Sequence, residues 1–321
     1  MTESSSTGAR SSLFHLTLGL ATLISTLGLG EIVREQWKNL DFKIPDLTAQ
    51  IQSVRATFFS EPGAAILGGL ILLLLAISLQ SLLKQLIKSP HVEQAPWTLS
   101  PLTVFAFFIF WFIGFLCISL TAGSVYKKWS HLNPTLVLIL IPYALQMAWG
   151  MFVLLRLGNF SWLSFIKQFS FRISPGDGLK IFQMFTLALV LVLTYSAVIN
   201  LFLRDPQSQA RLHEILGQSR SWTQWIPSGI ALTILAPLYE EIIFRGIFLT
   251  WLRPRIRIEW AVLLSGVVFA LFHMEIVAFP ALALLGCILA WSYLISQSIL
   301  VPITIHALWN LTALLGQIVR P

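Results

Sequence analysis

The chain has 321 residues, of which 56% are hydrophobic and only 11% charged, and its mean hydropathy is +0.79. Soluble domains carry about 25% charged residues, so this composition excludes an ordinary soluble domain and predicts a protein that crosses a membrane several times. The formal net charge is +7, but the lysines and arginines are scattered through short connections beside apolar runs, where they set orientation and touch lipid head groups. No basic stripe with interleaved aromatic residues is present, so we exclude nucleic acid as a partner and expect membrane lipid.

The first half of the chain contains apolar runs of membrane length that carry few polar groups. A mixed-charge segment at 31–63, with spaced apolar residues, predicts a short interfacial or extramembrane helix. Pro142 removes one helical hydrogen bond and predicts a kink in the run that contains it. The predicted spans in this half are 13–30, 64–83, 101–122 and 134–155.

The second half begins after a turn signal, Ser-Pro-Gly-Asp-Gly at 174–178. Its apolar runs come close together, and the loops between the last three are only a few residues long, so their polar side chains are forced toward one small bundle. We predict an all-α polytopic transmembrane bundle of about 8–9 membrane-spanning helices, with an accessory region at 1–175 and a core at 176–321. The predicted spans in the core are 179–203, 226–250, 258–274, 276–296 and 299–318.

Two adjacent carboxylates and an arginine interrupt the run at 226–250. Each such group at the centre of a bilayer costs at least ~2.5 kcal/mol, so these residues should face a protein interior or a water-filled cavity. Glu241 and Arg245 stand four residues apart and can form an ion pair along one helix face. Glu240 points roughly 100° away and has no cation three or four residues on, so it is predicted to face another group.

Each of the two later runs 258–274 and 299–318 contains one histidine. His273 lies in the first, and His306 lies in the second, followed one helical turn later by Asn310. His306 and Asn310 therefore share one face of a helix and can address one small target together. A single histidine on an apolar face is usually a core residue. Two of them behind a Glu-Glu-x-x-x-Arg helix are hard to explain independently.

A carboxylate, two histidines and an amide in a site without bulk water are the groups needed to hydrolyse a peptide bond. Glu240 can take a proton from water that His273 shares, and His306 with Asn310 can donate hydrogen bonds to the developing oxyanion. A zinc ion bound by Glu240, His273 and His306 is the alternative way of activating that water. The sequence contains neither His-Glu-x-x-His nor Gly-x-Ser-x-Gly.

Three motifs in order carry a family resemblance: Glu240-Glu241-x-x-x-Arg245, Phe269-x-x-x-His273 and His306-x-x-x-Asn310. They resemble the CPBP intramembrane proteases, which comprise the type II CAAX prenyl endopeptidases and bacterial relatives, some linked to bacteriocin processing and self-immunity. The resemblance covers roughly the last 100 to 140 residues. It implies that Glu240 is the base assisted by His273, that His306 and Asn310 form the oxyanion site, and that Glu241 and Arg245 are a supporting ion pair, with Phe269 as a further motif residue. It also favours a glutamate mechanism without a metal.

These observations together predict an integral, multi-pass membrane protein, in the plasma or inner membrane if it is bacterial, that acts as an intramembrane endopeptidase. The expected substrate is a peptide or protein cut near the C-terminus of a membrane-associated or prenylated, CAAX-like chain. The alternative is a catalytically idle scaffold or bacteriocin-immunity factor that binds a peptide or a partner protein. A proton-coupled transporter is disfavoured, because its polar residues should occur in two related halves, and here they lie only in the second.

Overall fold

The computed structural model describes residues 99–158, 170–202 and 221–319, with a few isolated positions between 34 and 80. These segments contain helices and turns and no strand, which confirms the predicted all-α class for the described part of the chain. The predicted spans 13–30 and 64–83 and the segment 31–63 lie almost wholly outside it, so the total of 8–9 spans stays a prediction. The elements are α5 Pro101–Lys128, η1 Leu136–Leu140, α6 Ile141–Gly158, α8 Asp177–Phe202, α10 Trp222–Ile230, η2 Ala231–Leu235, α11 Ala236–Glu241, η3 Ile242–Leu249, α12 Thr250–Leu252, α13 Ile258–Leu271, α14 Phe279–Ser296 and α15 Leu300–Val319.

Four helical segments of the described chain are long and apolar enough to cross a membrane, which supports an integral membrane protein. Two shorter apolar helices, Ile258–Leu271 and Leu300–Gly316, accompany them. The segments of spanning length are Pro101–Lys128, Leu136–Gly158, Asp177–Asn200 and Phe279–Ser296.

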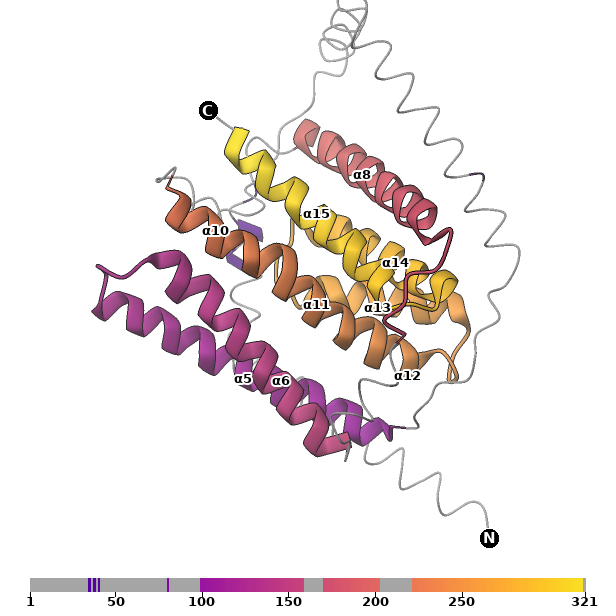
Figure 1. The fold of residues 1–321 in the computed structure, drawn as a ribbon, viewed down its shortest axis with the longest axis horizontal. Coiled ribbons are helices and arrows are strands. Elements are labelled where there is room, and N and C mark those ends of the chain that lie inside the picture. Colours follow the sequence, from indigo (N-terminus) through magenta and orange to yellow (C-terminus); the bar gives the residue numbers. More distant parts are fainter. Residues whose placement is uncertain are drawn as a thin grey trace, which may run out of the picture.

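The helices pack in layers around one nearly continuous helical segment, residues 222–252, which we call the glutamate helix (α10, η2, α11, η3 and α12). The antiparallel pair α5 and α6 lies on one flank of it, and α13, α14 and α15 lie on the other (Figure 1). Helix α8 covers the outer side of α14 and α15. The glutamate helix therefore stands in the middle of the described bundle.

Two π-helical segments, η2 and η3, interrupt the glutamate helix on either side of α11. In a π-turn an N–H donates to the carbonyl five residues earlier, and such turns are frequent at functional sites. A third, η1, lies directly before Pro142 in the span where the sequence predicted a kink. The irregularity of that span is therefore a π-turn beside the proline.

Small residues allow the helices to approach closely, as is common in membrane bundles. A Cβ atom on Gly286 of α14 would stand 2.7 Å from the Cα of Gly266 on α13. A Cβ atom on Gly150 of α6 would stand 1.9 Å from the hydroxyl of Tyr239 on the glutamate helix. The first contact requires glycine because it meets backbone, whereas at Gly150 a methyl group would fit only if the Tyr239 side chain moved.

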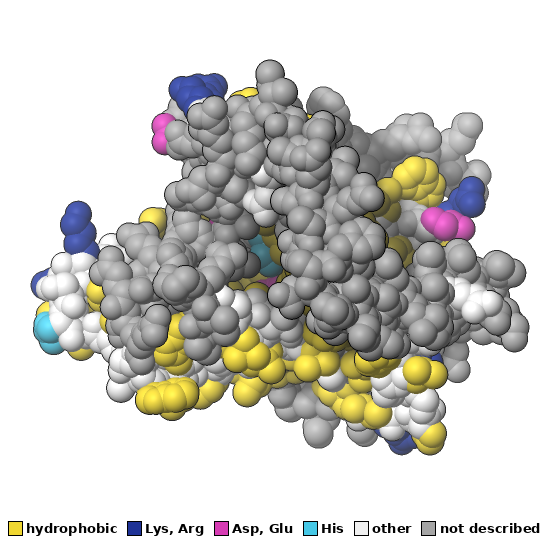
Figure 2. Space-filling view, turned by 90° about the horizontal axis from the view of Figure 1, so that it is seen from above, with side chains coloured by type: hydrophobic (Ala, Val, Ile, Leu, Met, Phe, Trp, Pro, Cys, Tyr) yellow, Lys and Arg dark blue, Asp and Glu magenta, His cyan; other side chains and the backbone are white. Residues whose placement is uncertain are grey.

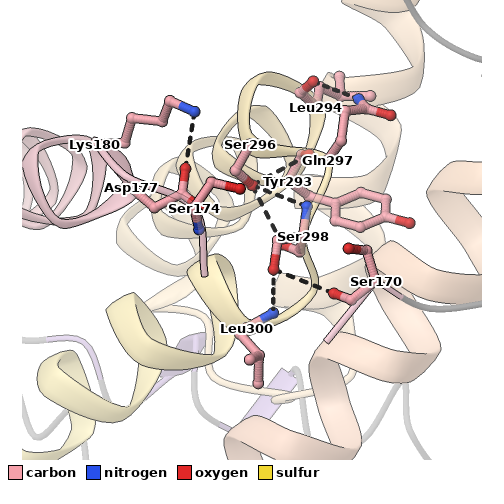
Figure 3. Close-up of polar contacts among 10 residues, drawn as sticks. All are labelled: Ser170, Ser174, Asp177, Lys180, Tyr293, Leu294, Ser296, Gln297, Ser298 and Leu300. Carbon is pink, nitrogen blue, oxygen red and sulfur yellow. Dashed lines mark hydrogen bonds and ion pairs between the residues drawn. The ribbon is translucent and has the colours of Figure 1, made fainter. Parts of the chain in front are cut away.

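Ser170, which lies shortly before the predicted turn at 174–178, is hydrogen-bonded to the connection between α14 and α15 (Figure 3). The carbonyl of Ser170 accepts hydrogen bonds from the backbone N–H of Ile299 (3.1 Å) and from the hydroxyl of Ser298 (3.2 Å). The carboxylate of Asp177 accepts one from the backbone N–H of Ser174 (2.7 Å). Residues on both sides of the predicted domain boundary at 175 thus contact the core, and the boundary stays a prediction.

Candidate active site

The predicted ion pair between Glu241 and Arg245 is confirmed, and both side chains are fully buried. Arg245 Nη1 donates to Glu241 Oε1 at 2.9 Å, and Nη2 donates across the bundle to the carbonyl of Gly286, also at 2.9 Å. The guanidinium carbon lies 4.8 Å from the centre of the Phe269 ring. Three elements, α11, α13 and α14, therefore hold this one cation in place.

His306 joins the same ion pair from α15. Its Nδ1 lies 2.8 Å from Glu241 Oε1, and the side chain is buried. Because an ionised carboxylate only accepts hydrogen bonds, Nδ1 carries a hydrogen and donates it. This link was not predictable from the sequence, because the two residues are 65 positions apart and no local spacing relates them.

Glu240 is in a different state from its neighbour. Its side chain is 16% exposed, whereas that of Glu241 is fully buried. Oε2 of Glu240 lies 3.9 Å from Nε2 of His306 and, like Oε2 of Glu241, has no hydrogen-bond partner among the described residues. Figure 2 shows a hollow near the centre of one face in which a histidine and an acidic side chain are visible. The predicted division is thus observed: Glu241 pairs with a cation of its own helical segment, and Glu240 faces a residue of another helix.

His273 lies in the turn after α13 and not inside a helix, so the prediction of one helical run over 258–274 is wrong at its end. The chain leaves helical geometry there, and Met274 has a φ of 52°. The ring Nδ1 of His273 donates to the carbonyl of Phe269 at 2.8 Å. No direct ion pair joins His273 to Glu240 in the described part of the chain.

Phe269 is the common neighbour of the two histidines. Its ring centre lies 4.7 Å from that of His273 and 5.6 Å from that of His306. The Phe269 side chain is fully buried beneath Arg245. It therefore sets the spacing between the two imidazole rings.

Asn310 follows His306 by one turn of α15, as the spacing predicted, and also bonds to the glutamate helix. Its Nδ2 donates to the carbonyl of Leu232 at 2.7 Å. A carboxamide nitrogen carries two hydrogens, so one N–H of Asn310 remains for another acceptor. His306 and Asn310 are thus each held by the glutamate helix.

Two tyrosines outside the predicted set lie near Glu240. The phenol groups of Tyr143, from α6, and Tyr239, from α11, lie within electrostatic range of the Glu240 carboxylate. Tyr143 belongs to the predicted accessory region, whose apolar runs gave no indication of a role at the site. The helix pair α5 and α6 therefore contributes to the surroundings of Glu240.

The zinc alternative requires at least three ligands to converge. In the described part of the chain no group of three or more His, Cys, Asp or Glu side chains is arranged to hold a metal ion. Glu240 and His306 are close to each other, whereas His273 is turned toward the carbonyl of Phe269. The residues named for zinc do not form a ligand set here, and we derive no step through a metal.

Comparison with known proteins identifies this region. Residues 222–312 match the family model described as type II CAAX prenyl endopeptidase Rce1-like. The match begins at the first residue of α10 and extends into α15, so it contains all three motifs. No curated protein and no solved structure matches the chain. The predicted family resemblance is confirmed for this segment: residues 222–312 match the Rce1-like model, which is consistent with the CPBP family.

Proposed function

We propose that the chain is an intramembrane endopeptidase in which Glu240 and His273 activate the water that attacks a peptide bond. The observation that carries the proposal is the partly exposed carboxylate of Glu240 inside the Rce1-like segment, whose Oε2 lies beside His306 and makes no hydrogen bond within the described residues. A buried polar atom without a partner costs about 1–3 kcal/mol, and more when it is charged. A carboxylate kept in that state is suited to binding a water molecule and taking its proton.

The orientation of His273 supports its role as the second water ligand. Its Nδ1–H is used by the carbonyl of Phe269, so in the neutral ring Nε2 has a free lone pair. A water molecule between Glu240 and His273 donates one hydrogen to each of them.

His306 and Asn310, both on α15, provide the oxyanion site. Asn310 has one N–H left after its bond to Leu232, and His306 offers Nε2. Since Nδ1–H is used by Glu241, donation from Nε2 requires hydrogens on both nitrogens of the His306 ring. Each such donor is worth about 10²–10³ in rate.

The reaction follows from these positions. Glu240 takes a proton from water, and the water oxygen bonds to the carbonyl carbon of the substrate, whose oxygen becomes the oxyanion held by His306 and Asn310. Glu240 then gives the proton to the leaving nitrogen as the carbon–nitrogen bond breaks. The family description supports a substrate cut near the C-terminus of a prenylated or other membrane-associated chain. A catalytically idle scaffold or bacteriocin-immunity factor remains the alternative, and it predicts binding without cleavage.

The test is cleavage of a quenched peptide library, with a prenylated set included, by purified protein in detergent. We expect the wild type to cleave and Glu240→Gln to be inactive. Glu259→Gln is the matched control, because Glu259 is 62% exposed and lies outside the site. Cleavage by Glu240→Gln at the wild-type rate would exclude the glutamate mechanism, and folded wild-type protein that cleaves nothing would favour the scaffold.

A further inference from the structure

The hydrogen-bond register of the glutamate helix changes just before Glu240. At the end of η2 the N–H of Ala236 donates to the carbonyl of Ala231, five residues earlier. With the same spacing, the donor for the carbonyl of Leu232 would be residue 237. That residue is a buried proline, which has no N–H. The register and the proline together leave the Leu232 carbonyl without a partner from its own helix.

Asn310 donates a hydrogen bond to the carbonyl that Pro237 leaves without a helical donor. Its Nδ2 donates to the Leu232 carbonyl at 2.7 Å, from a helix 78 positions away. A backbone carbonyl inside a bundle needs a partner, and the carboxamide supplies it. This bond fixes one N–H of Asn310 and thereby the direction of the other.

A second proline of the glutamate helix, away from the site, also leaves a carbonyl for an asparagine of another segment. Pro227 lies inside α10, where its missing N–H leaves open the carbonyl of Thr223, four residues earlier. Asn133 donates its Nδ2 to that carbonyl at 2.8 Å. A proline that reserves a carbonyl for an asparagine of another segment is therefore a repeated feature of this fold.

We propose that Pro237 is a positioning residue: by withholding an N–H it reserves the Leu232 carbonyl for Asn310 and aims the second N–H of Asn310 into the site. The catalytic consequence rests on the proposed function, whereas the hydrogen bond does not. Alanine at 237 introduces an N–H that competes with Asn310 for Leu232. Because alanine favours a helix more than proline does, this variant should fold at least as well as the wild type.

The direct experiment is NMR of protein labelled with ¹⁵N-asparagine, with the side-chain signal of Asn310 identified by its loss in Asn310→Ala. We expect Pro237→Ala to move the Asn310 carboxamide signal and leave that of Asn133 in place. Pro227→Ala is the matched control and should do the reverse. An Asn310 signal that is the same in wild type and Pro237→Ala would overturn the proposal, as would a shift of equal size in Pro227→Ala.

Kinetics on a cleaved peptide then test the role in the reaction. A misplaced catalytic group costs up to about 10²-fold, so Pro237→Ala should lower kcat by about tenfold or more with little change in KM. The same substitution in an Asn310→Ala background should have no further effect on kcat. Equal losses of kcat in both backgrounds would show that Pro237 acts other than through Asn310. Absence of cleavage by the wild type would count against the proposed function, while the NMR result would still decide the hydrogen bond.

Discussion

The helix pair α5 and α6 and the Rce1-like region 222–312 are both apolar enough for a membrane, but they fill their interiors differently. Between α5 and the glutamate helix the contacts are aromatic, with Trp111 touching Tyr239 and Phe244 and also reaching Phe272 just after α13. Inside 222–312 the fully buried contacts include an arginine, a carboxylate and a histidine bonded in sequence. Hydropathy therefore finds the spans, and only the buried polar residues indicate which spans carry chemistry.

Removing the buried cation should have the largest effect on stability. Arg245→Met leaves Glu241 buried with His306 as its remaining partner, and breaking a buried ion pair in this way typically costs about 3–5 kcal/mol. Thermal unfolding in detergent would measure the loss. The double variant Glu241→Gln/Arg245→Met should be less destabilised than Arg245→Met alone, and the opposite order would contradict the pairing.

Adding a methyl group at the close contact between α13 and α14 should have the next largest effect on stability. In Gly286→Ala the new methyl group meets the backbone of Gly266 at 2.7 Å, so the helices must separate, at about 1–3 kcal/mol. The Gly286 carbonyl then moves away from Arg245, and we expect cleavage to fall together with the unfolding midpoint. Unchanged activity and stability would show that this contact does not support the site.

The corresponding substitution between α6 and the glutamate helix should destabilise the protein less. In Gly150→Ala the methyl group meets the side chain of Tyr239, which can turn aside, so we expect a loss of about 1 kcal/mol. Gly123→Ala in α5 is the control, since nothing lies within 4 Å of its new Cβ atom, and it should be as stable as the wild type or slightly more stable. If Gly123→Ala were destabilised as much as Gly150→Ala, the contact with Tyr239 would not be the cause.

Chelation should have the smallest effect. The described residues offer no group of three metal ligands around Glu240, so we expect cleavage to continue at an unchanged rate in the presence of a strong chelator. Metal analysis of the purified protein provides the matching measurement. Activity that disappears with chelator and returns with zinc would restore the zinc alternative.

Local spacing predicted part of this site. The Glu241–Arg245 pair followed from residues four apart on one helix, and the shared face of His306 and Asn310 followed in the same way. The ends of most described spans also lie within a few residues of their predictions, because apolar runs report burial directly. The Rce1-like segment was recognisable from its three motifs.

Other features depend on contacts between distant segments and were not predictable. The bond from His306 to Glu241 and the bond from Asn310 to Leu232 join helices that no periodicity relates. The position of His273 outside α13 was hidden because the apolar run continues through the turn. The π-turns were hidden because a shift from four to five residues leaves no mark in composition. The prolines were visible in the sequence. Which carbonyl each proline leaves without a partner, however, depends on the hydrogen-bond register of the helix.

The most direct test compares the two neighbouring carboxylates, Glu240→Gln and Glu241→Gln, for cleavage and for thermal unfolding in the same detergent. We predict that Glu240→Gln unfolds like the wild type and loses cleavage by about 10²–10⁴-fold, the usual contribution of a general base. Glu241→Gln should unfold at a lower temperature, because the buried guanidinium of Arg245 loses its counter-ion. A Glu240→Gln protein that cleaves normally, or that unfolds as early as Glu241→Gln, would contradict the assignment of Glu240 as the catalytic base.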